Sequence, residues 1–339
     1  MRIVSILVLA AYASACGSDG DERAATCERL DYADQPSYVD LGPATFPVGV
    51  AVRVEPGEPV NDSWFMAELT YRFRMDTHEF TKGEFIELAG RLVGTQECDS
   101  LDCPMESMTI EKAMWVANAR SRRDGFEECY DFSGCTGSPL EPESFACERV
   151  ITSSSIRCTG YRVPTLAEYS YAIRGGTTTW TVCGRERGER YAPQYGCPVQ
   201  HAWFQVYPDI YPHLDNDAPR PVGLYCPNDF GIYDGHGNVA ELVGDSSLTI
   251  FPWDHEGTID GCCEAPPVVN PQGVAWGPAI FATSSYQTLL DDSGSWSFMP
   301  HVPPLAPDFI NTAMGVRFVR TLEIPDVVTQ LEGRDTLPD

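Results

Sequence analysis

A glycine-rich segment with closely spaced oxygen ligands, Pro227 to Asp245 (PNDFGIYDGHGNVAELVGD), constrains this chain more than any other stretch. Gly235 and Gly237 can adopt positive φ, which residues with a Cβ resist, so main-chain carbonyls there can turn towards one point. Asp234 before this turn and Glu241 after it add two carboxylates. A hard cation such as Ca²⁺ takes roughly six to eight oxygen ligands of both kinds. The segment predicts a calcium site; the alternative is a tight turn in which Asp234 only accepts a local hydrogen bond.

The segment resembles the signature of the formylglycine-generating enzyme family, also called the sulfatase-modifying factor family. That signature is a proline-asparagine-x-aromatic-glycine-leucine-tyrosine-asp run, followed by methionine-x-glycine-asparagine-valine-tryptophan-glutamate-tryptophan. The resemblance implies that two side chains and two main-chain carbonyls hold a calcium ion, namely the side chains of Asp234 and Glu241 and the carbonyls of Gly237 and Val239. The sequence departs from the signature, without losing an oxygen ligand, at Gly235, Ala240 and Leu242.

Three helices are predicted, each from a threonine N-cap followed by a short amphipathic run. The caps are Thr81, Thr109 and Thr165. We expect the first helix to bury a face that reaches Leu92, the second to end at Gly125, and the third to end at the glycine pair 175–176. The third region, YRVPTLAEYSYAIRGG, also resembles the family's arginine-leucine-proline-threonine-glutamate-alanine-glutamate-tryptophan motif.

The resemblance extends, with gaps, from about Met75 to an asparagine-x-x-x-glycine-x-arginine run that begins at Asn311. It implies an irregular α+β fold, related to the C-type lectin fold and poor in regular secondary structure. The expected organisation is a signal peptide (1–15), a polar tether (16–38), one family-like domain (39–322) and an acidic tail (323–339).

The N-terminus has the build of a bacterial secretory signal, with one basic residue, an apolar run and small residues before Cys16. Ala13-Ser14-Ala15-Cys16 resembles a lipobox, in which the cysteine is lipidated, but it also fits an ordinary signal-peptidase site. Lipidation of Cys16 would leave twelve of the 13 cysteines, an even number that suits disulfides in an oxidising compartment. We therefore expect an exported, disulfide-rich protein of the cell envelope, an outer-membrane lipoprotein that meets the membrane through its anchor alone.

The formal net charge of −26 argues against nucleic-acid binding, because a phosphate backbone requires a basic surface. It fits a solvated acidic surface better than a dedicated site for a basic partner. Cysteine spacing predicts two small disulfide loops, Cys98 with Cys103 and Cys129 with Cys135, with zinc loops as the alternative.

Active members of the family oxidise a sulfatase cysteine to formylglycine, using O₂ and copper held by two cysteines near the C-terminus. Thiolates are the ligands that Cu(I) requires. The corresponding stretch here, Gly273 to Tyr286, contains no cysteine, and Cys263 is the last one in the chain. Cys262 and Cys263 are adjacent and so are poorly placed to chelate one ion; we expect them to form separate disulfides. Copper is therefore not expected.

The remaining candidate residues give weaker evidence for a catalytic or binding role. We expect His236 to face solvent within the turn and His78 to lie at the surface or partly packed, and neither has a placed partner for general base catalysis. The aromatic side chains of Trp253, Trp276 and Trp296 could receive a sugar or a peptide, but core packing is the expected role. The sequence favours a module that binds a protein, peptide or glycan over an enzyme. The alternatives are a divergent formylglycine-generating oxidase and a purely structural envelope component.

Overall fold

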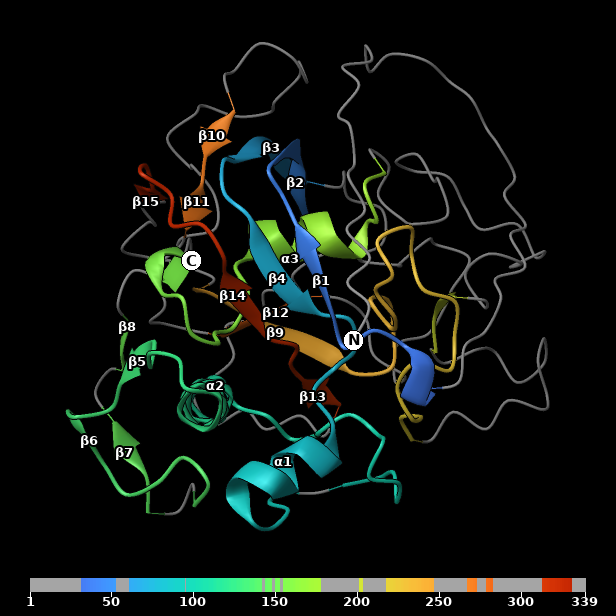
Figure 1. The fold of residues 1–339 in the computed structure, drawn as a ribbon, viewed down its shortest axis with the longest axis vertical. Helices are drawn as coiled ribbons and strands as arrows, with labels where there is room; N and C mark the ends of the chain where they lie inside the picture. The colour runs from blue at the N-terminus through green and yellow to red at the C-terminus, as the bar shows by residue number, and fades with distance from the viewer. Residues whose placement is uncertain are drawn as a thin grey trace.

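The computed structural model describes residues 32–52, 61–94, 96–141, 144–147, 150–152, 155–177, 201–203, 218–246, 267–272, 279–282 and 313–330. Three α-helices and several small sheets lie among long irregular segments in this part of the chain (Figure 1). The α+β class and the low content of regular structure agree with the prediction. None of the helices in the described ranges has the length and apolar character needed to cross a bilayer.

The three predicted helices are present as α1 (Lys82–Ala89), α2 (Ile110–Asp124) and α3 (Leu166–Ile173), each with its predicted threonine N-cap. The caps of α1 and α3 form complete capping boxes with the glutamate three residues on. Helix α1 ends before Leu92 because Gly90 adopts the left-handed conformation that closes a helix; Leu92 is exposed. Two 3₁₀ turns, η1 and η2, cover Tyr32–Asp34 and Ser155–Arg157.

Three three-stranded sheets organise the domain. The first has the order β1 (Tyr38–Leu41), β4 (Phe73–Asp76), β14 (Val319–Thr321), and all its pairs are antiparallel. The second has the order β10 (Val268–Val269), β3 (Asn61–Leu69), β2 (Ala44–Val52). The third has the order β12 (Ala279–Ala282), β9 (Ala240–Ser246), β13 (Met314–Gly315).

Three two-stranded ladders complete the described sheets. They are β5 (Tyr130–Asp131) with β8 (Ile151–Thr152), β6 (Cys135–Thr136) with β7 (Ala146–Cys147), and β11 (Pro271–Gln272) with β15 (Thr329–Gln330). The first two lie beside α2, away from the first sheet (Figure 1).

The apolar core has two main parts. One lies between the first two sheets and α3, and includes Phe73 and Met75 from β4 and Tyr169 from α3. The other surrounds α1 and α2, and includes Phe85 and Met114. Helices α1 and α2 lie together at one end of the domain, and α3 lies behind β1 and β4 (Figure 1). The predicted site lies between these two parts, because β9 contributes Leu242 to one cluster and Val243 to the other.

The disulfides confirm one predicted loop and correct the other. Cys98 pairs with Cys103 as expected. The expected link between Cys129 and Cys135 is wrong: Cys129 pairs with Cys158 and Cys135 with Cys147. The reason is strand register, because the pairing of β6 with β7 places Cys135 directly opposite Cys147. Cys226 is also disulfide-bonded, whereas Cys16, Cys262 and Cys263 lie outside the described residues.

Parts of the predicted tether and acidic tail contact the domain. Gln35, which follows η1, is buried and donates to the main-chain oxygen of Gly223 (3.0 Å). In the tail segment, Asp326 accepts a hydrogen bond from Arg157 through its main-chain oxygen (2.9 Å). The described ends of both segments are thus held by side-chain contacts to the domain.

Candidate functional site

A fully buried ion pair between Arg317 and Glu241 lies at the centre of the predicted site. Arg317 Nε and Nη2 each donate to one carboxylate oxygen of Glu241 at 2.6 Å, and neither side chain is exposed. Arg317 also donates to the main-chain oxygens of Thr77 (3.2 Å) and Tyr233 (3.1 Å), and the Tyr169 hydroxyl donates to Glu241 (3.1 Å). The two-point contact fixes both side chains. The pair therefore joins β9, α3 and the segments after β4 and β13.

The turn before β9 has the predicted tight geometry, with a different distribution of unusual backbone angles. Positive φ values occur at Asp234 (51°), Gly237 (89°) and Asn238 (56°). Gly235 does not have positive φ, contrary to expectation. Its lack of a side chain matters for space, because a Cβ there would lie 3.1 Å from Ile173 Cγ2 of α3. The turn is therefore packed directly against the end of α3.

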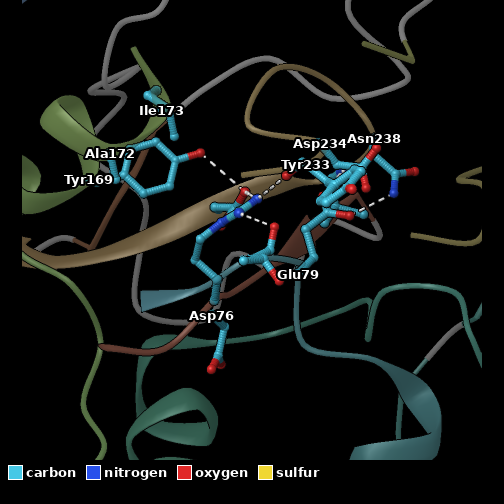
Figure 2. Close-up of polar contacts among 12 residues, drawn as sticks. Asp76, Glu79, Tyr169, Ala172, Ile173, Tyr233, Asp234 and Asn238 are labelled. Atoms are coloured by element: carbon cyan, nitrogen blue, oxygen red, sulfur yellow. Dashed lines mark hydrogen bonds and ion pairs between the residues drawn. The ribbon is translucent and has the colours of Figure 1, made fainter. Parts of the chain in front are cut away.

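A second buried acid, Glu79, holds the far side of the turn. Its Oε2 accepts from the side-chain amide of Asn238 (2.6 Å), and its Oε1 accepts from the main-chain N–H of Val239 (3.0 Å). Asn238 also accepts from the main-chain N–H of Arg220 (2.9 Å). In Figure 2 Tyr169 lies on one side of this network, and Glu79, Asp234 and Asn238 lie on the other.

Negative charge exceeds positive charge in this buried region. Burial first, and then the charges of Asp234 and Glu241, raise the pKa of Glu79 well above its ordinary value. Burial is also the main cause that raises the pKa of Asp234 to about 6, although Asp234 accepts a hydrogen bond from the Gly223 N–H (2.6 Å). Arg317 is the cation that opposes both shifts. Three carboxyl groups thus share one guanidinium, which favours an added cation or a bound proton.

The residues present fit the predicted calcium ion in charge and in donor type. Oxygen donors are available from Asp234, Glu241 and the main-chain carbonyls of the turn, and hard cations prefer such donors. Within the described ranges no three His, Cys, Asp or Glu side chains are arranged to hold a metal ion by themselves, so main-chain carbonyls would have to contribute. Both oxygens of Glu241 already accept from Arg317, so the ion would share them, which a carboxylate with several lone pairs allows.

The two histidines near the turn are buried, which corrects the prediction for His236. His236 is 2% exposed, and burial lowers its pKa well below the ordinary value. His78 is 8% exposed, stacks on Tyr233 with 4.7 Å between ring centroids, and contacts Gln35 Oε1 (2.5 Å). Burial, followed by the charge of Arg317, lowers the pKa of His78 to about 3. Both imidazoles are therefore neutral at pH 7 and enclosed by the protein, and the turn that carries His236 packs against Ile173 at the end of α3.

Strand β12 lies within the stretch from Gly273 to Tyr286, where the resemblance led us to expect the family's copper ligands, and it pairs antiparallel with β9. The described part of the predicted stretch, Ala279 to Ala282, contains no cysteine, like the rest of that stretch. All seven cysteines in the described ranges are disulfide-bonded. Trp253, Trp276 and Trp296 lie outside the described residues.

A family profile described as "Sulfatase-modifying factor enzyme 1-like domain" matches residues 65–322. The chain belongs to this family. The match spans the ion pair, the turn and β12, so each feature of the candidate site lies inside the sulfatase-modifying factor domain. A curated relative, "Chaperone protein LppX" of Paenibacillus barcinonensis, is 28% identical over 146 residues, which is 41% of this chain. The chain spans about half the length of that relative.

Solved structures support the family fold. "Treponema denticola variable protein 1" has a TM-score of 0.54 at 16% identity, covering 84% of this chain and 99% of that one. "Crystal Structure of CarF" has a TM-score of 0.51 at 22% identity, covering 84% of this chain and 98% of that one. At these identities the similarity shows the fold alone. The predicted irregular sulfatase-modifying factor fold is thereby confirmed.

The sequence did not predict the roles of Glu79 and Arg317. Both lie in segments that resemble family motifs, MDTHEF and NTAMGVRF, but by themselves those motifs indicate only elements of the fold. The available signal was the charge itself, because a lone acid or base within an apolar run requires a buried partner. Its partner could not be identified from spacing, since Glu241 is 76 residues from Arg317.

Proposed function

We propose that this chain is an exported, lipid-anchored binding module of the sulfatase-modifying factor family that does not carry out the copper-dependent oxidation. The single observation that carries the proposal is the absence of any cysteine after Cys263. Without two thiolates facing one point, Cu(I) lacks the soft ligands it needs. The disulfide bonding of all described cysteines supports structural use of sulfur in this domain.

Calcium at the turn before β9 forms part of the proposal. Asp234, the carbonyls of Gly237 and Val239, and Glu241 would hold the ion, which would supply positive charge to an acidic interior. Its role would be structural. The surplus of buried carboxyl groups over guanidinium groups supports this assignment.

Export and a protein partner are supported from two directions. Disulfides persist in oxidising compartments outside the cytosol, and a lipid on Cys16 would anchor the chain in the cell envelope, which in our proposal is at the outer membrane. The relative from Paenibacillus is named a chaperone, and a chaperone binds another polypeptide. A protein or peptide is therefore favoured as the main partner of this domain.

Incubating the purified protein with a sulfatase-type cysteine peptide, copper and O₂ is expected to yield no formylglycine. The reason is the missing thiolate pair. Mass spectrometry of the peptide measures the product, and a copper-loaded active family member serves as the positive control.

The intact mass of the protein, measured before and after alkylation, should show no free thiol and a lipid on Cys16. Conversion of the peptide together with two alkylated cysteines would establish the competing function, a divergent oxidase with relocated thiols.

Native pull-down from envelope extract is expected to recover the same protein partner in independent preparations. The immobilised chain should lose that partner when the extract contains an excess of soluble chain. A family member of similar charge on the same matrix controls for acidic, nonspecific adsorption. If no protein or glycan is recovered reproducibly, a purely structural envelope component becomes the better assignment.

A further inference from the structure

A second candidate site is a pocket of about 380 Å³ between α2 and the disulfide-linked loops that follow it. Its lining residues come from α2, from β5 and β6, and from the loops next to these strands. These elements lie side by side in Figure 1. No residue of this pocket belongs to the turn before β9 or to the Arg317–Glu241 pair. Ligand pockets usually measure roughly 300–1,000 Å³, so this one suits a small molecule or the end of a chain.

The pocket is held open by contacts that do not involve a ligand. The side chain of Asn118 on α2 accepts from the N–H groups of Cys129 (3.1 Å) and Tyr130 (3.2 Å) and donates to the Tyr130 oxygen (2.6 Å). Two disulfides, Cys129–Cys158 and Cys135–Cys147, tie the same loops together. A preorganised wall loses little conformational entropy when a ligand binds.

The opposite wall is held equally closely. Gly137 has positive φ (77°), and a Cβ there would lie 2.2 Å from the main-chain oxygen of Ser144, so the hairpin closes too tightly for any side chain. Within the hairpin, the Glu141 N–H donates to the Ser138 oxygen (2.8 Å), and the Ser144 N–H donates to the Glu141 oxygen (2.9 Å). The loop that carries Ser138 therefore has a defined shape before any ligand arrives.

The lining combines aromatic rings with oxygen acceptors. Three partly buried aromatic side chains line the pocket, Trp115, Phe132 and Phe145. Asp131 is exposed, and its Oδ1 accepts from the Ser133 N–H (2.7 Å), which helps to keep the carboxylate ionised. Aromatic faces attract the weakly positive C–H groups of a sugar ring, and carboxylates and hydroxyls bind its hydroxyl groups.

The charge of the lining disfavours an anionic ligand. The arginine in this wall, Arg122, is paired with Glu128 at 2.5 Å. The remaining charge in the lining is that of Asp131, so a phosphate or a carboxylate would meet net repulsion. A neutral, hydroxyl-rich ring satisfies both the aromatic and the acceptor groups.

We infer that this pocket binds one or two residues of a neutral saccharide, with a sugar ring against the aromatic wall and its hydroxyls bonded to Asp131 and the nearby serines. The site requires no metal. It goes beyond the proposed function, which concerns the candidate site at β9 and a protein partner. The proposed function and the sugar-binding inference can be contradicted separately. Oxidation of the peptide, or failure to recover a protein partner, would leave sugar binding at this pocket unchanged.

The test titrates the intact, disulfide-bonded chain with D-glucose, D-galactose, D-mannose and N-acetyl-D-glucosamine, using saturation-transfer NMR and calorimetry. We expect saturable binding of at least one sugar, and weakening of about tenfold or more in both Phe132→Ala and Asp131→Asn. Matched controls outside the pocket are Tyr38→Ala and Asp34→Asn, two exposed residues of the same chemical kinds. These should bind as the wild type does.

Three outcomes would overturn the inference. The first is no saturable binding of any of the four sugars at about 20 mM, which would mean that any dissociation constant lies well above this concentration. The second is equal binding by pocket and control variants, which would place the sugar elsewhere. The third is binding of benzylamine, a cationic aromatic probe, without binding of any sugar. Should Phe132→Ala fail to fold, Asp131→Asn still decides the question, because Asp131 is exposed.

Discussion

Replacing Arg162 by methionine is expected to lower the free energy of unfolding by about 3–5 kcal/mol. Arg162 and Glu168 form a second fully buried pair, with two contacts of 2.7 and 2.6 Å and neither side chain exposed. Arg162 also donates to Thr321 Oγ1 (2.9 Å), and Tyr71 donates to Glu168 (2.9 Å). Methionine would leave Glu168 charged and buried without its cation. Urea denaturation at pH 7 measures the loss.

Arg91→Met provides the matched control, because Arg91 pairs with Glu141 at 3.0 Å while both side chains are about 60% exposed. Exposed pairs contribute at most about 1 kcal/mol, so this variant should unfold nearly as the wild type does. Equal losses in the two variants would show that burial does not set the strength of these pairs.

The pH dependence of this loss follows from the pKa of Glu168. Burial would raise that pKa, but the charge and hydrogen bonds of Arg162, with further hydrogen bonds from Thr165 and Tyr71, lower it overall. A carboxyl group with a lowered folded-state pKa stabilises the protein above its unfolded pKa and loses that contribution as pH falls through the folded value. The difference between wild type and Arg162→Met should therefore shrink in acid, below about pH 4. A constant difference from pH 7 to 3 would contradict this.

The second large effect is expected at Glu241, where the calcium and ion-pair roles can be separated. Glu241→Gln should lower stability by about 3 kcal/mol in chelator, because Arg317 loses its buried partner. In the wild type, calcium at about 100 times its Kd should add about 2.7 kcal/mol, and the variant should lose this gain as well. Thermal and urea unfolding with and without chelator measure both quantities.

Asp234→Asn is the matched variant for the same measurement, because it removes a predicted calcium ligand and leaves the Arg317–Glu241 pair intact. It should abolish the response to calcium without lowering stability in chelator. The sign follows from the raised pKa of Asp234, about 6. A carboxyl group with a raised folded-state pKa loses stabilisation as pH rises through that value, so ionised Asp234 is unfavourable at pH 7 without a cation. Identical wild-type unfolding with and without chelator would exclude the calcium site and leave the ion pair in place.

Helix positions were predictable because their signals are local. Thr81 and Thr165 each find their capping glutamate three residues on, and Gly90 and Gly125 close their helices from the next position. The Cys98–Cys103 loop is local in the same sense, because its cysteines are only five positions apart in the sequence. The predicted link between Cys129 and Cys135 also assumes that a cysteine pairs with its near neighbour in the sequence. In this region strand pairing determines the partners instead.

The sequence by itself determined the family, the helix caps, the oxygen-rich turn and the absence of a late cysteine pair. Each of these depends on residue identity or on neighbours within a few positions. Only the tertiary structure decided that Glu241 pairs with Arg317, that His236 is buried, that Cys135 meets Cys147, and that α2 and its loops enclose a pocket. The physical reason is that these contacts depend on strand register and packing between distant segments, which local spacing does not encode.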